Sequence, residues 1–539
     1  MSTTGRERLA EADARRLWLL CAAFLCAASL LVFRGALALF FAQEDFRGLA
    51  VAAGLMPRAH QLWRYVSVQA FMDVFFPLFG DRAAPYHAVS LGFHALNAVL
   101  LFTLCARHLS KPAALVGATF YAVHPALFTA VSWQSERGDL LAVSFALLAV
   151  LLALRSGASR WLAVPAFALS LLSKESTLGA PAVVALMGWR PPANRARPVR
   201  RWRLDPLALA LLAESALYLL VVMRSNRSGN GVGFDPSSAY GFDFGAGFVG
   251  NLLTYLGWTV DLAMSAPGLR FMDRQNPALA PLGLTILAGV ALISAWPGLR
   301  RRPWLIGVVG FFALLLPVLP FRNHAYHHFL YAPLAAAGLC VGTIVDSLAR
   351  PRSPERVESA AADPRPRAGS EPWPPAFAWL IAGLCCAALT WNGARLVDQI
   401  ARQRSPSYPL LHADPVVDRS LIAERAFRTI RAAAPPRGTR LMFVMRERVA
   451  LLGRIARGAK EAPPPAQEVY TEANVRVALF GGMGVRALVP AIDSVAFVTR
   501  LRPLGPAERY AVYAPTGEVE LHDQGSMDSL LASPWITRW

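Results

Sequence analysis

Long, nearly uninterrupted apolar segments constrain the fold of this chain more than any other feature. The first covers residues 17–41, and similar segments recur as far as residue 394. Of the residues, 55% are hydrophobic and only 17% are charged, which is too little charge for a typical soluble chain. Within a bilayer only helices and closed barrels satisfy every backbone polar group. Because the apolar residues are continuous rather than alternating, the sequence predicts a polytopic α-helical membrane protein.

The hydropathy and the charge bias together predict about eleven membrane spans. They are expected at residues 17–41, 86–107, 112–131, 139–154, 161–172, 176–189, 205–223, 280–297, 304–320, 328–348 and 376–394. Two neighbouring segments, 161–172 and 176–189, are shorter than the roughly 20 residues of a normal span. We interpret this pair as a broken hairpin with its tip at residues 173–176. Segment 248–265 is ambiguous, because it is apolar but contains Asp261, and we treat it as only partly inserted.

The basic residues indicate the orientation of the chain. The formal net charge is +19, and arginines concentrate in short loops at 190–203, 300–302 and 350–367. This distribution is typical of the positive-inside rule, so we expect no nucleic-acid partner. The arginine-rich N-terminus is predicted to be cytoplasmic, followed by an uncleaved anchor because the apolar run is too long for a signal peptide. We expect a multi-pass protein of the plasma membrane, in particular a bacterial inner membrane.

This topology collects chemically varied side chains on the extracytoplasmic side, whereas the opposite side is simply basic. An acidic pair, Glu44 and Asp45, follows the first span directly. Carboxylates at the mouth of a membrane bundle are costly to place near lipid and tend to be functional. Further polar side chains are expected on the same side: Arg64, Arg137, Asp139, Lys174, Glu175, His324, His327 and His328. We therefore expect the chemistry of the protein on this side.

Two other regions have a distinct character. Residues 60–71 mix aromatic and polar side chains at helical spacing and predict an interfacial helix. After residue 397 the apolar spans end, which divides the chain into a membrane domain, 1–397, and a C-terminal domain, 398–539. A helix at 420–434 and short strands at 440–445, 475–479, 495–499 and 510–514 are predicted there. They indicate a small α/β or α+β domain, which an odd number of spans would place outside the cell.

Several short motifs follow one another in a fixed order over residues 17–350. They are Trp63-Arg64-Tyr65-Val66-Ser67, Tyr86-His87, Leu96-Asn97, Ala122-Val123-His124-Pro125, Ala130-Val131-Ser132-Trp133, Arg137-x-Asp139-Leu140-Leu141-Ala142, Leu171-Leu172-Ser173-Lys174-Glu175, Leu316-Pro317-Val318-Leu319-Pro320 and Phe329-Leu330-Tyr331-Ala332-Pro333. In this order the chain resembles the membrane glycosyltransferases of the GT-C superfamily. The resemblance is greatest to the protein O-mannosyltransferase and tetratricopeptide-carrying O-mannosyltransferase-like branch and its bacterial relatives. The tetratricopeptide repeats of that branch are missing here, and residues 398–539 take their place.

The resemblance implies an enzyme that moves a hexose from a polyprenyl-phosphate donor to a protein or glycan acceptor, with inversion suspected. In such enzymes the first outer loop carries an acidic pair that serves as general base or orients the acceptor. Here the pair is Glu44-Asp45, whereas the family usually has two Asp or Asp-Glu, so the identity of the base stays open. Because the C-terminal domain lies outside the resemblance, we expect it to govern the choice of acceptor.

The side chains fit this chemistry. A carboxylate can take the proton of the acceptor hydroxyl as an oxocarbenium-like centre develops. The leaving lipid phosphate needs cations, for which Arg64, Arg137 and Lys174 are available. His327, His328 and Tyr331 could donate further hydrogen bonds, while Asp139 and Glu175 would support the cations. No cofactor is certain; a divalent cation could bind the carboxylates, although the sequence shows no clear set of metal ligands.

Other interpretations stay open at this point. The acidic pair could be a solvated loop pair, Arg137 and Asp139 a structural ion pair, and Lys174-Glu175 the cap of a short hairpin. The histidines could be interfacial residues. A lipid or glycan transporter or flippase would also be polytopic, but symmetry-related halves are expected there and none is evident. A non-catalytic scaffold would leave the gathering of charged residues on one side unexplained.

Overall fold

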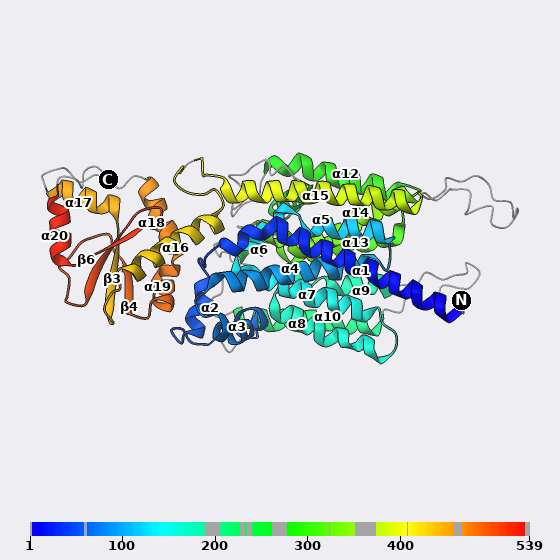
Figure 1. Cartoon of the computed structure of the whole chain (residues 1–539), viewed down its shortest axis with the longest axis horizontal. Coiled ribbons are helices and arrows are strands. Elements are labelled where there is room, and N and C mark those ends of the chain that lie inside the picture. The colour runs from blue at the N-terminus through cyan, green and yellow to red at the C-terminus, as the bar shows by residue number, and fades with distance from the viewer. Residues whose placement is uncertain are drawn as a thin grey trace, which may run out of the picture.

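The computed structural model describes residues 3–58, 62–188, 205–226, 232–233, 240–260, 277–322, 324–350, 373–406, 408–456 and 466–533. It shows an elongated helical bundle with a small domain of strands and helices at one end (Figure 1). The N-terminal end of the first helix lies at the opposite end of the molecule. The chain is thus a largely helical protein with a small C-terminal sheet region, as the sequence predicts.

Fifteen helices precede the C-terminal domain in the described part of the chain. They are α1 (Thr3–Phe33), α2 (Asp45–Ala52), α3 (Phe71–Phe79), α4 (Ala83–Cys105), α5 (Lys111–Ala122), α6 (Phe128–Ser132), α7 (Arg137–Ala153), α8 (Ala163–Ser173), α9 (Ala180–Gly188), α10 (Pro206–Asn226), α11 (Ala246–Val260), α12 (Ala280–Ala295), α13 (Arg301–Leu315), α14 (Tyr331–Ala349) and α15 (Pro375–Arg402). Two short strands, β1 (Val232–Gly233) and β2 (Tyr240–Gly241), pair between α10 and α11.

Seven helical segments in the described residues are long and apolar enough to cross a membrane. They are Glu11–Ala38, Ala83–Cys105, Pro206–Arg224, Pro277–Ala295, Arg301–Val318, His327–Ala349 and Pro375–Arg402. The pair Lys111–Ala122 and Pro125–Ser132, bent by 46°, would make an eighth if it is one broken span. The chain is therefore a membrane-embedded helical protein. The remaining predicted spans, 139–154, 161–172 and 176–189, correspond to the shorter helices α7, α8 and α9.

The broken hairpin is confirmed. Helix α8 ends at Ser173, Lys174 is extended, a single 3-10 turn covers Glu175–Thr177, and α9 begins at Ala180. The interfacial helix begins later than predicted, because Val66–Ala70 forms a π-helical turn that continues into α3. His60 and Gln61 lie outside the described residues, and Arg64 has a φ of +53° that no helix accommodates. The ambiguous segment 248–265 is helical up to Val260; Asp261 lies outside the described residues.

Small residues allow the bundle helices to approach closely. A Cβ atom added to Gly117 in α5 would lie 2.3 Å from the carbonyl oxygen of Gly338 in α14. An added Cβ at Gly179 would lie 2.1 Å from the carbonyl oxygen of Ala313 in α13. Such contacts favour van der Waals packing, which holds helices together where lipid removes the hydrophobic driving force. These contacts hold α5 against α14, and α13 against the segment that follows Lys174.

The C-terminal domain has a four-stranded sheet in the order β4-β3-β5-β6. Its elements are α16 (Pro415–Ala432), β3 (Thr439–Met445), α17 (Arg446–Ala456), α18 (Ala466–Ala478), α19 (Met483–Leu488), β4 (Ile492–Phe497), β5 (Glu508–Tyr513), β6 (Val519–His522) and α20 (Gln524–Ala532). Strand β3 is parallel to β4 and β5, and β6 is antiparallel to β5. The predicted helix at 420–434 and the strands near 440, 495 and 510 are confirmed, with shifted ends.

The strand predicted at 475–479 is wrong, because these residues belong to the end of α18 and the turn after it. Val475, Ala478 and Leu479 are each 0% exposed, and their i, i+3, i+4 spacing marks one face of a helix. This face packs against the sheet in the same core as Leu441 and Phe443 of β3. The short apolar run therefore has the period of a helix, about 3.6 residues, and not the period of 2 that a strand would have. Strand β6 had not been predicted.

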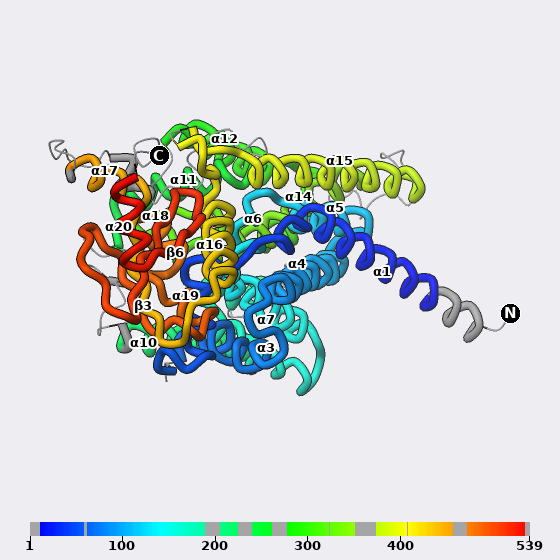
Figure 2. The backbone as a smooth tube through the Cα atoms, turned by 60° about the vertical axis from the view of Figure 1, so that its left-hand side comes forward, coloured from blue at the N-terminus to red at the C-terminus, as the bar shows by residue number. Residues whose placement is uncertain are grey.

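The C-terminal domain packs directly on the end of the bundle that carries α2. One hydrophobic core contains Phe41 and Phe46 together with Phe427 and Leu441. Figure 1 places α2 at the end of the bundle next to the domain, and Figure 2 turns this end toward the reader. The backbone N–H of Phe40 donates a hydrogen bond of 2.7 Å to Ser420 Oγ of α16. We call this the site end, and the end with Ser110, Arg300 and Asp346 the basic end.

Candidate functional site

The acidic pair lies at the start of α2, and Asp45 points into the protein. The Asp45 side chain is only 6% exposed. Its Oδ2 accepts a hydrogen bond from the backbone N–H of Ala42 (3.0 Å), and its Oδ1 accepts one from Ser135 Oγ (2.8 Å). Burial raises the pKa of Asp45 to about 7, although these two bonds and the charge of Arg137 act in the opposite direction. Asp45 is thus a buried carboxylate that titrates near neutrality.

Glu44 has different surroundings, because its side chain is exposed. Nearby protein still desolvates the carboxylate and raises its pKa, while Arg419 and Arg47 lower it. The two members of the pair are therefore not equivalent. Asp45 contacts the loop that carries Ser135, and Glu44 faces outward at the same end of the bundle.

A buried ion network forms around Lys174, which lies at the break between α8 and α9. Lys174 Nζ donates to Asp139 Oδ2 (2.7 Å) and also to Glu136 Oε2. Lys174 is 3% exposed and Asp139 is 0% exposed. Desolvation alone would raise the pKa of Glu136, but the positive charges of Lys174 and Arg64 outweigh it and hold this pKa below its usual range. His328 Nε2 lies 3.6 Å from Glu136 Oε1.

The two arginines of the predicted site also have protein partners. Arg64 forms a two-pronged contact with Glu175, with its Nε 3.2 Å from Oε2 and its Nη2 bonded to Oε1. Arg137 donates to the backbone carbonyls of Ser67 (2.7 Å) and Gln134 (2.8 Å). Its guanidinium also lies over the ring of Phe71, with Cζ 4.5 Å from the centroid. These contacts join loops that are far apart in the sequence into one site.

The three remaining predicted residues, His327, His328 and Tyr331, have different neighbours. His328 belongs to the ion network, whereas the ring of His327 stacks on Trp258 with centroids 4.0 Å apart. Tyr331 is 0% exposed, and its hydroxyl lies 2.9 Å from His94 Nδ1 and 3.1 Å from Asn97 Nδ2. Because His94 Nε2 must donate to the carbonyl of Ala122, neutral His94 accepts at Nδ1 and Tyr331 donates to it. The structure therefore does not bring the Tyr331 hydroxyl into the network around Lys174.

Sequence reasoning missed Glu136 and Ser135, which connect the acidic pair to the ion network. Both lie in the 3-10 turn just before Arg137, in a connection that the sequence predicts on the same side as the acidic pair. An acidic residue beside the arginine at the mouth of a span was the available signal for Glu136. Ser135 carried no such signal, because a serine in a loop is common, and only the fold brings it to Asp45.

Several buried polar atoms around this network have no hydrogen-bond partner among the described residues. They are Ser132 Oγ, Trp133 Nε1, Asp139 Oδ1, Ser176 Oγ and His328 Nδ1. Such atoms are rare in folded proteins because burying them unpaired costs free energy. The site thus has spare hydrogen-bonding capacity of both kinds, donor and acceptor. Within the described ranges, no group of three or more His, Cys, Asp or Glu side chains is arranged to hold a metal ion.

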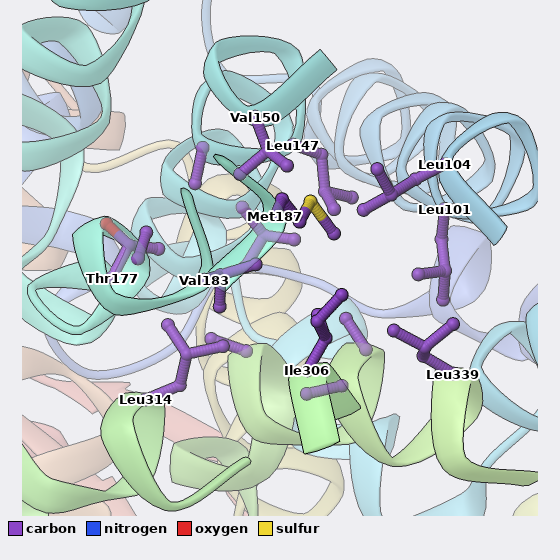
Figure 3. A pocket seen from close by; sticks show the side chains of 16 residues that line it. Leu101, Leu104, Leu147, Val150, Thr177, Val183, Met187, Ile306, Leu314 and Leu339 are labelled. Atoms are coloured by element: carbon purple, nitrogen blue, oxygen red, sulfur yellow. The ribbon is translucent and has the colours of Figure 1, made fainter. Parts of the chain in front are cut away.

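An apolar cavity lies inside the bundle between α4, α7, α9, α13 and α14 (Figure 3). Its empty space is about 550 Å³, counting the part open to the outside. The lining is apolar except for Thr177, whose hydroxyl is paired with that of Ser170 at 2.7 Å. A charged phosphate or a sugar would lose its hydration there without compensation, so the polar chemistry belongs to the network around Lys174 and Asp45.

The chain was compared with protein-family models, curated proteins and solved structures, and no match was found in any of the three. The arrangement of its own residues therefore carries the functional argument. That arrangement brings together a carboxyl group whose pKa is about 7, three cationic side chains, and polar atoms that have no partner among the described residues. All lie at one end of the bundle.

Proposed function

We propose that this protein is a membrane glycosyltransferase that moves a sugar from a polyprenyl-phosphate donor to an acceptor at the site end. The burial of Asp45, which raises the pKa of its carboxyl group, is the observation that carries the proposal. A general base works best when its pKa lies near the working pH, and burial raises the pKa of Asp45 to about 7. A solvated loop carboxylate would titrate near 4 instead.

In the proposed reaction the acceptor oxygen attacks the anomeric carbon while the bond from this carbon to the phosphate oxygen breaks. The electron pair of the broken bond leaves with the lipid phosphate, and the proton of the acceptor hydroxyl passes to Asp45. This single displacement inverts the anomeric centre. Exposed Glu44 would orient the acceptor, because it lies next to the base and faces outward.

Arg64 is the best candidate for contact with the donor phosphate. Its side chain is 26% exposed, compared with 4% for Lys174. Its planar guanidinium already binds the Glu175 carboxylate through two nitrogens, and a phosphate can replace a carboxylate in this geometry. The charge of Lys174 is matched by Glu136 and Asp139, so Lys174 and Arg137 would chiefly hold the site in shape. His327 and His328 stay candidates for further contacts with the donor.

The unpaired polar atoms support a sugar as the transferred group. Hydroxyl groups both donate and accept, and the atoms at Ser132, Trp133 and Asp139 offer both possibilities. The Trp133 indole also lies beside the His328 ring, with centroids 6.3 Å apart. In this proposal the site end faces away from the cytoplasm, in a bundle of about eleven spans. The acceptor would be a protein or a glycan.

The test is transfer of radiolabelled sugar from a polyprenyl-phosphate donor in membranes that contain the protein. Asp45→Asn is expected to lower turnover by about 10²–10⁴-fold, because proton removal by a general base contributes that much. Asp346→Asn, which changes a buried aspartate at the basic end, is the matched control and should retain its turnover per folded molecule. Near-normal transfer by both Asp45→Asn and Glu44→Gln would overturn the proposal and favour a transporter or a scaffold.

A further inference from the structure

The backbone immediately before the acidic pair is strained. Gln43 has a φ of +56°, which lies in the left-handed region. Residues other than glycine rarely adopt this conformation, because the Cβ atom crowds the backbone. Where such a conformation persists, the surrounding structure must impose it, and such strain gathers at functional sites. Gln43 is 4% exposed, so its neighbours in the fold can supply this constraint.

Two polar contacts from the C-terminal domain hold Gln43, in addition to the hydrogen bond that its carbonyl accepts from the backbone N–H of Phe46 (3.2 Å). The backbone N–H of Gln43 donates to the carbonyl of Ala478 in α18 at 3.1 Å. The side-chain Oε1 of Gln43 accepts a hydrogen bond of 2.5 Å from Arg419 Nη1 in α16. Arg419 is itself held by Asn474 Oδ1, at 2.9 Å from its Nε. The Asn474 amide in turn donates to Asp418 Oδ2 at 2.7 Å.

A second contact fixes α2 just after the acidic pair. Phe46 is 0% exposed and packs against Gly484 in α19, where an added Cβ would lie 2.7 Å from the ring. The ring of Phe427 in α16 lies 5.5 Å from that of Phe46. The C-terminal domain therefore contacts the chain both immediately before and immediately after Glu44 and Asp45.

We propose that the C-terminal domain positions the acidic pair, with Arg419 as the positioning residue that holds the left-handed turn at Gln43. The inference rests on the proposed function, since it assigns Asp45 a reaction to perform. The role of the domain then goes beyond any choice of acceptor. By fixing the backbone at Gln43, it orients the Asp45 side chain toward Ser135. Arg419 bonds to Gln43, and its charge also lowers the pKa of the neighbouring Glu44.

Two substitutions of Gln43 separate the turn from the side chain. Both Gln43→Gly and Gln43→Ala remove the bond to Arg419, but only glycine adopts a positive φ without steric cost. We expect Gln43→Ala to lower kcat by about tenfold, with the donor KM unchanged. Gln43→Gly should retain a clearly higher kcat than Gln43→Ala. A Gly variant as slow as the Ala variant, or slower, would overturn the role of the left-handed turn.

A substitution in the domain tests the same link from the other side. Arg419→Ala should lower kcat by about tenfold, and Arg419→Lys should restore part of it by keeping a donor near Gln43. Arg428→Ala is the matched control, because Arg428 lies in the same helix and pairs with Glu424 at the surface. Amide hydrogen exchange in residues 40–52 should rise in Arg419→Ala and not in Arg428→Ala. Hydrogen exchange can be measured whether or not the protein transfers sugar.

The outcomes separate the two proposals. If Asp45→Asn is inactive while Arg419→Ala shows wild-type kcat and wild-type exchange, the positioning role is wrong and the proposed function stands. If Asp45→Asn and Glu44→Gln both keep near-normal transfer, the proposed function is wrong. In that case the exchange measurement still decides whether Arg419 holds the segment, and unchanged exchange would overturn the positioning role as well.

Discussion

The two ends of the bundle each bury an aspartate, but the surroundings of the two differ. At the basic end, Asp346 is 0% exposed and binds the guanidinium of Arg300 as well as the hydroxyl and the backbone N–H of Ser110 (3.1 Å for the latter). At the site end, the Asp45 carboxylate is hydrogen-bonded by the neutral groups of Ala42 and Ser135, and by no cation among the described residues. Fifteen residues of α14 separate Asp346 from Tyr331, a distance of about 22 Å along the helix.

The comparison shows that two buried carboxylates can have different kinds of partner, a charged guanidinium in one case and neutral groups in the other. A cation that bonds directly to a buried carboxylate stabilises its charged form, so Asp346 is suited to joining α5, α13 and α14. Asp45 lacks such a bond, and burial therefore disfavours its charge. The nearby ion network around Lys174 resembles the basic end in its pairing but leaves Asp139 Oδ1 without a partner among the described residues.

The largest effect on stability is expected from Lys174→Met. It removes the one positive charge that contacts both buried carboxylates, Glu136 and Asp139, and breaking a buried pair in this way typically costs about 3–5 kcal/mol. Thermal unfolding in detergent should show this loss. Lys111→Met, at the basic end, is the control and should change little. A stable Lys174→Met protein would mean that the network is hydrated, and that the contrast between the two ends is smaller than proposed.

Asp346→Asn should have the next largest effect. The amide keeps an acceptor for Ser110 but loses the charge-assisted bond to Arg300, at a cost of about 1–3 kcal/mol in stability. Sugar transfer per folded molecule should be unchanged, because the residue lies at the basic end. A loss of transfer greater than the loss of folded protein would contradict the division between a structural and a functional end.

The pH dependence distinguishes the ends more directly. Asp45 must be ionised to act as a base, so the rate of transfer should rise about tenfold between pH 6 and pH 8. Stability should change in the opposite direction. Because the pKa of Asp45 is raised to about 7 in the folded protein, its stabilising contribution is present at low pH and is lost as the pH rises through about 7. Asp45→Asn should remove both trends; a rate independent of pH in the wild type would exclude Asp45 as the base.

Arg64→Lys is expected to have the smallest effect. Lysine keeps the positive charge but cannot bind Glu175 or a phosphate through two nitrogens, so the donor KM should rise by a factor corresponding to about 1 kcal/mol. The kcat should stay close to that of the wild type. Arg58→Lys, which changes an exposed arginine paired with Asp73, is the control. An unchanged KM would place the phosphate away from Arg64.

Much of the architecture follows from local sequence patterns. The apolar segments predict the helices, and the short pair 161–172 and 176–189 predicts the break at which Lys174 lies. The failed strand at 475–479 shows the limit, since five residues are too few to separate a period of 2 from a period of 3.6. The side chains of the candidate site could be assigned to one end, but their partners could not. Pairings such as Arg64 with Glu175 span 111 residues, which no local pattern encodes.

By itself, the sequence determined that this is a largely helical membrane protein with a C-terminal region of strands and helices. These properties follow from composition and local periodicity. Only the tertiary structure decided that Asp45 is buried while Glu44 is exposed, that Lys174 lies between two carboxylates, and that Arg419 reaches Gln43 across 376 residues. The physical reason is that desolvation and hydrogen bonding depend on which atoms meet in space, and these two effects set the pKa of Asp45.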